Sequence, residues 1–132
     1  MILVDTSAIV SIIDATDPNH RRAVDFWSQV VDQDLDALTH SYVVSEATSL
    51  IQRRHGFSAA RFLLDDFLSG VEVHFVDPDL QEAGVTAFLA AGSRSISLVD
   101  QVSFALMRQR DIRRAFAFDD DFLKAGFETV PD

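Results

Sequence analysis

The chain of 132 residues has no cysteine, no hydrophobic run as long as a membrane span, and only 11 lysine and arginine residues. The absence of cysteine excludes disulfide bonds, thiolate metal ligands and a cysteine nucleophile. The apolar run at the N-terminus stops at Asp5, too early for a signal peptide, and no later run approaches the about 20 residues of a transmembrane helix. We therefore expect a cytoplasmic protein that does not enter a membrane.

Basic residues are outnumbered by 21 acidic ones, which gives a formal net charge of −10. A surface with this charge repels nucleic acid unless basic residues cluster locally or metal ions neutralise the acids. The charge therefore counts against a general nucleic-acid binder. It is compatible with a metal site built from carboxylates and with a basic protein partner.

Short apolar segments alternate with segments of helical periodicity along the whole chain. We expect strands at residues 2–4, 35–39, 71–76, 115–118 and 127–130. We expect helices at residues 8–14, 18–31, 41–54, 58–70, 78–91 and 97–111, with a short helical turn ending at 126. Helices that connect short apolar strands are typical of an α/β sandwich around a mainly parallel sheet. The length and the lack of a linker indicate one domain.

Four acidic residues fall where these strands end or these helices begin. Asp5 and Asp119 follow two of the apolar strands, and Glu46 and Asp100 lie near the start of two helices. Each also has a simpler interpretation, as a helix cap for Asp5 or an exposed residue in the first turns for Glu46. Asp100 has the spacing of a capping box with Ser97. Asp77, which precedes a proline, is interpreted as a cap only.

The carboxyl ends of parallel strands and the amino ends of the following helices meet at one edge of the sheet, so the four acids can converge. Two carboxylates ~4 Å apart repel by about 4 kcal/mol at an effective dielectric constant near 20. Such a cluster must bind protons or a cation. Ligation by oxygen alone favours Mg²⁺ or Mn²⁺ over Zn²⁺. The four histidines, at positions 20, 40, 55 and 74, are scattered, and we expect them on the surface or in loops.

Four short motifs occur in a fixed order: residues 1–8, Ser45-Glu46-Ala47, residues 97–100, and residues 119–122. Together they resemble the PIN-domain nucleases, most closely the VapC-type toxins of bacterial toxin–antitoxin pairs. The resemblance covers essentially the whole chain. It implies a PIN-like three-layer α/β/α sandwich with a mainly parallel central sheet, formed as a single domain by residues 1–132.

The resemblance also implies roles for individual residues. The acids that would hold Mg²⁺ or Mn²⁺ are Asp5, Glu46, Asp100 and Asp119. Ser7 matches the position whose hydroxyl supports the first acid or a metal-bound water, and Asp121 is a candidate outer ligand, with Asp120 pointing away. Two departures from the family pattern are Gln101, where a small residue is common, and the three successive aspartates, where a basic residue is common.

The chemistry implied is metal-assisted hydrolysis of phosphodiester bonds by an endoribonuclease acting on single-stranded or loop RNA. Arg53 and Arg94 are the first candidates for gripping the substrate, followed by the arginines at positions 54, 108, 113 and 114. Each of them can instead be a solvated helix end. The implied partner is a VapB-like antitoxin, whose basic C-terminal segment could insert among the carboxylates.

A homodimer is also expected from the resemblance. The apolar residues that could form an antitoxin groove or a dimer face, although core is their default role, are Trp27, Phe57, Phe62 and Phe67. Two other readings of the chain remain. A haloacid-dehalogenase-type phosphatase needs a second aspartate two residues after the first, where this chain has Ser7. A catalytically silent PIN-like module would use its acids only as helix caps and act by binding a protein.

Overall fold

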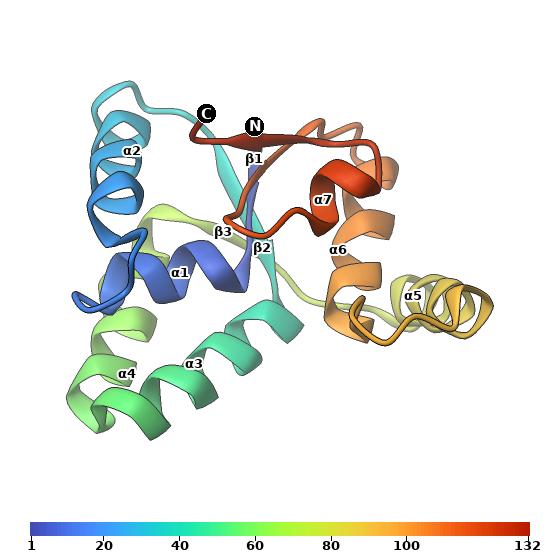
Figure 1. The fold of residues 1–132 in the computed structure, drawn as a ribbon, viewed down its shortest axis with the longest axis horizontal. Coiled ribbons are helices and arrows are strands. Elements are labelled where there is room, and N and C mark those ends of the chain that lie inside the picture. Colours follow the sequence, from blue (N-terminus) through green and yellow to red (C-terminus); the bar gives the residue numbers. More distant parts are fainter.

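A five-stranded parallel sheet runs through the centre of the molecule in the computed structural model, which describes all residues 1–132 (Figure 1). Its strand order is β3-β2-β1-β4-β5, and every pairing is parallel. The strands are β1 (Ile2–Val4), β2 (Ala37–His40), β3 (Glu72–His74), β4 (Arg114–Phe116) and β5 (Glu128–Val130). The parallel sheet expected from the sequence is therefore confirmed, with β1 at its centre.

Helices cover both faces of this sheet. They are α1 (Thr6–Ile13), α2 (His20–Asp32), α3 (Ser41–His55), α4 (Phe57–Asp65), α5 (Pro78–Ala91), α6 (Leu98–Gln109) and α7 (Asp121–Lys124), with a 3₁₀ turn η1 (Phe67–Gly70) after α4. Figure 1 shows α1 to α4 on one side of the sheet and α5 to α7 on the other. This arrangement is the three-layer α/β/α sandwich that the resemblance implies.

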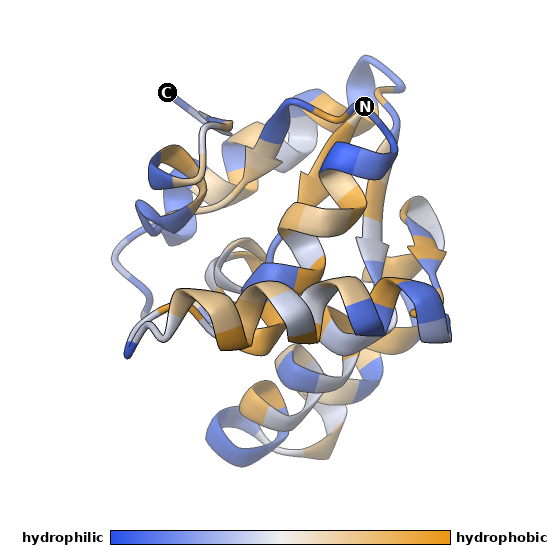
Figure 2. Ribbon diagram, turned by 90° about the vertical axis from the view of Figure 1, so that its right-hand side faces the viewer, coloured by the Kyte–Doolittle hydropathy of each residue, from blue (hydrophilic) through white to orange (hydrophobic).

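Two hydrophobic cores, one on each face of the sheet, hold the layers together. Successive side chains of a strand point to opposite faces, so Ile2 and Val4 enter the core under α1 to α4, whereas Leu3 enters the core under α6 and α7. Figure 2 shows hydrophobic residues gathered between the layers and hydrophilic residues toward the helix ends and loops. Because β1 is buried on both faces, it gives the residue that follows it, Asp5, a rigid support.

Several element boundaries differ from the expected ones. Helix α1 begins at Thr6, two residues before the expected start, and Asp5 is its N-cap. Helix α2 begins at His20 rather than at residue 18, because the Asp17 carboxylate accepts hydrogen bonds from the Asn19 backbone and the Ser11 hydroxyl and so closes a separate turn.

The expected helix at residues 58–70 is divided into α4 and η1. Phe62 and Phe67 were both expected to face inward, but Phe62 is 46% exposed while Phe67 is buried. Five residues along a continuous helix correspond to a rotation of about 140°, so the two side chains cannot share one face. The break after Asp65 instead turns Phe67 into the core, where its ring contacts Trp27 with 4.8 Å between the ring centroids.

No helix of the protein combines the length and the hydrophobicity that crossing a membrane requires.

Candidate functional site

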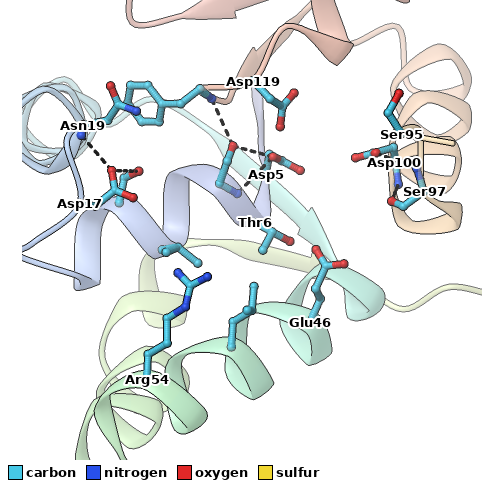
Figure 3. Close-up of a pocket in the computed structure, with 15 residues that line it drawn as sticks. Asp5, Thr6, Asp17, Asn19, Glu46, Arg54, Ser95, Ser97, Asp100 and Asp119 are labelled. Carbon is cyan, nitrogen blue, oxygen red and sulfur yellow. Dashed lines mark hydrogen bonds between the residues drawn. The ribbon is translucent and has the colours of Figure 1, made fainter.

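A pocket of about 480 Å³ opens beside the carboxyl end of β1 and the first turns of α3 and α6. All four acids singled out in the sequence line it, namely Asp5, Glu46, Asp100 and Asp119. Figure 3 shows their side chains extending from four different elements toward a common space. Ser7 also lines this pocket, whereas Asp121 does not.

Asp5 lies deepest in the site and is only 4% exposed. As the N-cap of α1, its Oδ2 atom accepts hydrogen bonds from the backbone nitrogen of Ser7 at 3.1 Å and from the Ser7 hydroxyl at 2.6 Å. Burial raises its pKa from the ordinary 3.8 to about 7, against the lowering effect of Ser7, and the charges of Asp119 and Asp100 raise it further. An ionised Asp5 is therefore costly unless a positive charge lies nearby.

The Ser7 hydroxyl joins two segments that are far apart in the sequence. Besides donating to Asp5, it accepts a hydrogen bond of 3.1 Å from the backbone nitrogen of Phe118. Phe118 immediately precedes Asp119, so this single hydroxyl fixes the end of β1 relative to the segment that follows β4 (Figure 3). Ser7 thus contacts both Asp5 and the residue that precedes Asp119.

Asp100 forms the reciprocal cap that its spacing with Ser97 predicts. Its Oδ2 atom accepts from the Ser97 backbone nitrogen at 2.9 Å, and its own backbone nitrogen donates to Ser97 Oγ at 3.1 Å. The cap engages one carboxylate oxygen and leaves the other free of protein partners. Capping and metal ligation are therefore compatible at Asp100, as they are at Asp5.

The three successive aspartates have different environments. Asp119 lies at the rim of the pocket, and the partial enclosure of its carboxyl group raises its pKa, with further contributions from the charges of Asp121 and Asp100. Asp120 points to solvent and pairs with Lys124 at 3.3 Å. The pKa of Asp121 is also raised, first by desolvation and then by Asp100, and its backbone nitrogen donates to Asp119 Oδ1 at 3.2 Å.

Of the arginines considered for substrate binding, only Arg54 lines the pocket; Arg53 and Arg94 do not. Arg108 lies against the rings of Phe104 and Phe127. Arg113 and Arg114 are at the amino end of β4, opposite the acidic rim. Arg53 and Arg54 are successive residues of α3, so their side chains leave the helix about 100° apart, and only that of Arg54 reaches the pocket.

His40 was expected on the surface or in a loop, but it is completely buried at the end of β2. Its Nδ1 atom accepts from the backbone nitrogen of Val43 at 3.4 Å, so its Nε2 atom carries the proton and donates to Ser103 Oγ at 2.8 Å. Desolvation lowers its pKa from 6.5 to about 4, and His74 lowers it further, so the ring is neutral. This contact joins the first turn of α3, ahead of Glu46, to α6, which carries Asp100.

The chemistry of the donor set fits a hard divalent cation. The pocket offers carboxylate oxygens from five acids, the four named above and Asp17, and no histidine or sulfur. Such oxygen ligands are the type that Mg²⁺ and Mn²⁺ prefer. No three acidic or histidine side chains are drawn together closely enough to form a complete metal cage. The fit therefore rests on the shared pocket, the all-oxygen donors and the raised pKa values of Asp5 and Asp119.

A parallel sheet between two helical layers, with four acids converging at the carboxyl ends of its central strands, is the architecture of a PIN domain. The family model described as "PIN domain" matches residues 2–128, and the chain belongs to this family. Within the family it is similar to the 23S rRNA-specific endonuclease VapC20 of Mycobacterium tuberculosis H37Rv, with 37% identity over 131 residues, or 98% of each chain.

Solved structures agree with this assignment. The crystal structure of Mycobacterium tuberculosis VapC20, described as a toxin that cleaves the sarcin–ricin loop, has a TM-score of 0.87 and 34% identity over 96% of both chains. FitAcB from Neisseria gonorrhoeae has a TM-score of 0.72 at 16% identity, covering 99% of this chain and 97% of that one, and shares the fold. The predicted fold and the predicted membership of the VapC-type PIN-domain nucleases are confirmed.

Proposed function

We propose that this chain is an endoribonuclease toxin whose target is the sarcin–ricin loop of 23S rRNA. The observation that carries this proposal is the 37% identity to VapC20 across 98% of both chains, together with a pocket in which four acids converge. The similarity extends over the whole chain and is not confined to one segment of the fold. We expect the cut to lie within the loop, where RNA bases are unstacked and accessible.

We propose Mg²⁺ or Mn²⁺ as the cofactor, held by Asp5, Glu46, Asp100 and Asp119. A bound divalent ion would supply an activated water and neutralise charge on the scissile phosphate. The protein then needs no nucleophilic side chain. Asp5 would be kept ionised by the cation, Ser7 would hold its carboxylate in place, and the Ser97 cap would do the same for Asp100.

The proposed inhibitor is a VapB-like antitoxin with a basic segment that enters the acidic pocket. The charge of −10 and the raised pKa of Asp5 both favour a cationic occupant over bare phosphate. We also propose a homodimer, for which the exposed apolar residues Phe57 and Phe62 on α4 are candidate contacts. Because ribosomes are cytoplasmic, the protein is expected to act in the cytoplasm.

A second candidate function is a catalytically silent module that binds a protein. The observation in its favour is that Asp5 and Asp100 already serve as helix caps, a role that needs no metal. If this were their only role, Mg²⁺ or Mn²⁺ at millimolar concentrations would not stabilise the fold.

Purified, antitoxin-free protein should be incubated with intact ribosomes and Mn²⁺, and the ends of the 23S rRNA mapped. We expect a single cut in the sarcin–ricin loop that is absent with EDTA and absent with Asp5→Asn. Asp120→Asn, which changes a neighbouring exposed acid, serves as the matched control and should cut like the wild type. Cutting elsewhere would reject the target, and no cutting of any RNA would favour the silent module.

A further inference from the structure

The pocket does not end at the four acids but continues between α1 and α3. The residues that line this extension, which we call the Arg54 arm, are Val10, Ser11, Asp17, Asn19, Leu50 and Arg54. Figure 3 shows Arg54 extending from α3 on the same side of the pocket as Asp17 and Asn19, away from Asp100. The arm belongs to the same cavity as the acids, so a ligand held by the acids can extend into it.

Helix α3 connects the two parts of the pocket. Glu46, Leu50 and Arg54 are spaced by four residues, which places them along one face of the helix. The rise of a helix separates the first and the last by about 12 Å. This is longer than one nucleotide, so a strand with its scissile phosphate at the acids would present a different phosphate to Arg54.

Arg54 is the only basic residue among the 15 that line the pocket. Four of the five carboxylates of the pocket lie at its other end and repel an RNA backbone, whereas the carboxylate of Asp17 in the arm accepts hydrogen bonds from Ser11 and Asn19. The strand is therefore expected to leave along the part that offers a positive charge. Arginine is suited to this contact because its planar guanidinium can donate two parallel hydrogen bonds to a phosphate.

The wall of the arm opposite α3 is fixed by hydrogen bonds. Asp17 Oδ1 accepts from Asn19 N at 2.8 Å and from Ser11 Oγ at 3.0 Å, and the His20 ring is 2.8 Å from the Ser11 carbonyl. The side-chain amide of Asn19 makes no hydrogen bond within the protein. It is therefore a donor and acceptor held at the surface of the arm and free to meet a polar ligand.

A buried hydroxyl at the junction of the two parts also lacks a partner. Thr6 is 7% exposed, lines the pocket, and its Oγ1 atom is buried without any hydrogen bond. In Figure 3 it lies between Asp5 and Glu46. Buried polar groups are usually paired, so an unpaired hydroxyl here points to a polar ligand at the junction.

We propose that the Arg54 arm binds the nucleotide next to the cleaved bond in single-stranded RNA. Arg54 contacts the neighbouring phosphate, Val10 and Leu50 provide apolar contact for the base, and Asn19 hydrogen-bonds the base edge. The proposal rests on the proposed function, because it assumes that a cation held by the acids binds the scissile RNA phosphate. It adds a residue that grips the substrate and one that selects the base.

A structural role for Arg54 would be to complement the negative end of the α3 dipole, as a base in the last turn of that helix. Arg53 has the same charge, the same helix end and a similar exposure, but it lies outside the pocket. Arg53→Ala is therefore the matched control for Arg54→Ala. Any effect common to both variants belongs to the helix end and not to the arm.

The test is the binding of a fluorescent single-stranded RNA octamer, with the sarcin–ricin loop sequence, to protein that carries Asp5→Asn and cannot cut. We expect Arg54→Ala to weaken binding about tenfold or more, as the loss of a charge-assisted hydrogen bond implies. The slope of log affinity against log salt should fall by about 0.7, the value for one phosphate contact. Arg53→Ala should change neither quantity. Equal effects of the two variants would overturn the proposal.

Base selection is tested with Asn19→Ala and octamers that differ at one position. We expect the variant to lose the preference for one base at that position that protein with Asp5→Asn alone shows. An unchanged preference would reject the assignment of base selection to Asn19. Loss of antitoxin binding by Arg54→Ala, without loss of RNA binding, would assign the arm to a peptide and also overturn the proposal.

The arm and the proposed function can fail separately. If the wild type cuts RNA and Arg54→Ala cuts with an unchanged KM, the arm is rejected and the nuclease stands. If the wild type cuts no RNA but Arg54→Ala still weakens RNA binding relative to Arg53→Ala, the nuclease is rejected and the arm stands.

Discussion

The Ser7 hydroxyl donates a hydrogen bond of 2.6 Å to Asp5, the most buried acid of the pocket. The same oxygen accepts from the backbone of Phe118, so it holds the segment that carries Asp119 against the end of β1. A hydroxyl in this position sets the distance between two acids that repel each other. The geometry of the site therefore depends on a residue that has no charge.

We expect Ser7→Ala to reduce RNA cleavage by about 10- to 100-fold, the usual effect of removing a group that orients a metal ligand. It should also lower the free energy of unfolding by about 1–2 kcal/mol, because the Phe118 nitrogen loses its partner. Ser49→Ala, at an exposed serine on α3 without a hydrogen bond, is the control. Activity equal to that of the control variant would show that Ser7 does not position the acids.

The three adjacent aspartates should respond differently to replacement by asparagine. Asp119→Asn is expected to lower kcat by about 100-fold or more, since Asp119 lines the pocket and is a proposed ligand of the divalent cation. Asp121→Asn should have a smaller effect, of about tenfold at most, because Asp121 lies outside the pocket lining. Asp120→Asn should act like the wild type. A larger loss of activity in Asp121→Asn than in Asp119→Asn would make Asp121 the metal ligand and Asp119 the outer residue.

The buried Asp5 should make the protein less stable as the pH rises, when measured in EDTA. Its pKa is about 7 in the folded protein and 3.8 ordinarily, so the folded state favours the protonated form. Stability is therefore lost between pH 4 and 7, by up to about 4 kcal/mol. Asp5→Asn should remove this loss and be more stable than the wild type at pH 8. Urea unfolding at pH 5 and pH 8 measures this change in the free energy of unfolding. The same dependence on pH in the wild type and in Asp5→Asn would contradict the prediction.

The buried His40 should make the protein more stable as the pH rises, which is opposite to the effect of Asp5. Its pKa is about 4 in the folded protein and 6.5 ordinarily, so the stability that its neutral ring contributes is complete above pH 6.5. That contribution, about 3 kcal/mol, is lost as the pH falls toward 4. Asp5 changes the stability with pH in the opposite direction. The pH dependence of the free energy of unfolding should therefore be measured in protein that carries Asp5→Asn. His40→Asn should flatten the profile there.

Ser103→Ala is the companion variant for His40. It should lower the free energy of unfolding by about 1–3 kcal/mol at every pH, because the Nε2 proton of His40 loses its buried acceptor. The dependence of that free energy on pH should remain. If Ser103→Ala flattened the profile as His40→Asn does, the slope would not come from titration of the ring.

The strand ends and the caps could be read from the sequence because they depend on local patterns. An apolar run that stops at an aspartate led to Asp5, and the spacing from Ser97 to Asp100 predicted a capping box that the structure contains. The parallel sheet then required the acids to meet at one edge. The order of the motifs along the chain was sufficient to suggest the family.

Contacts between distant elements could not be read in the same way. His40 is buried because α6 packs over the end of β2, and nothing near His40 in the sequence indicates Ser103 as its partner. Arg54 could not have been chosen over Arg53 from its spacing to Glu46, because a separation of seven residues returns closer to the face of Glu46 than a separation of eight. That the facing wall is formed by the turn after α1 likewise depends on the tertiary fold.

The most direct test of this account is a calorimetric titration of the wild type with Mn²⁺ in the absence of RNA. We expect Mn²⁺ binding that is lost or strongly weakened in both Asp5→Asn and Asp119→Asn, and is unchanged in Asp120→Asn. Mn²⁺ should also raise the Tm of the wild type but not that of Asp5→Asn. Absence of Mn²⁺ binding by the folded wild type, or equal binding by all four proteins, would contradict the claim that these acids form a metal site.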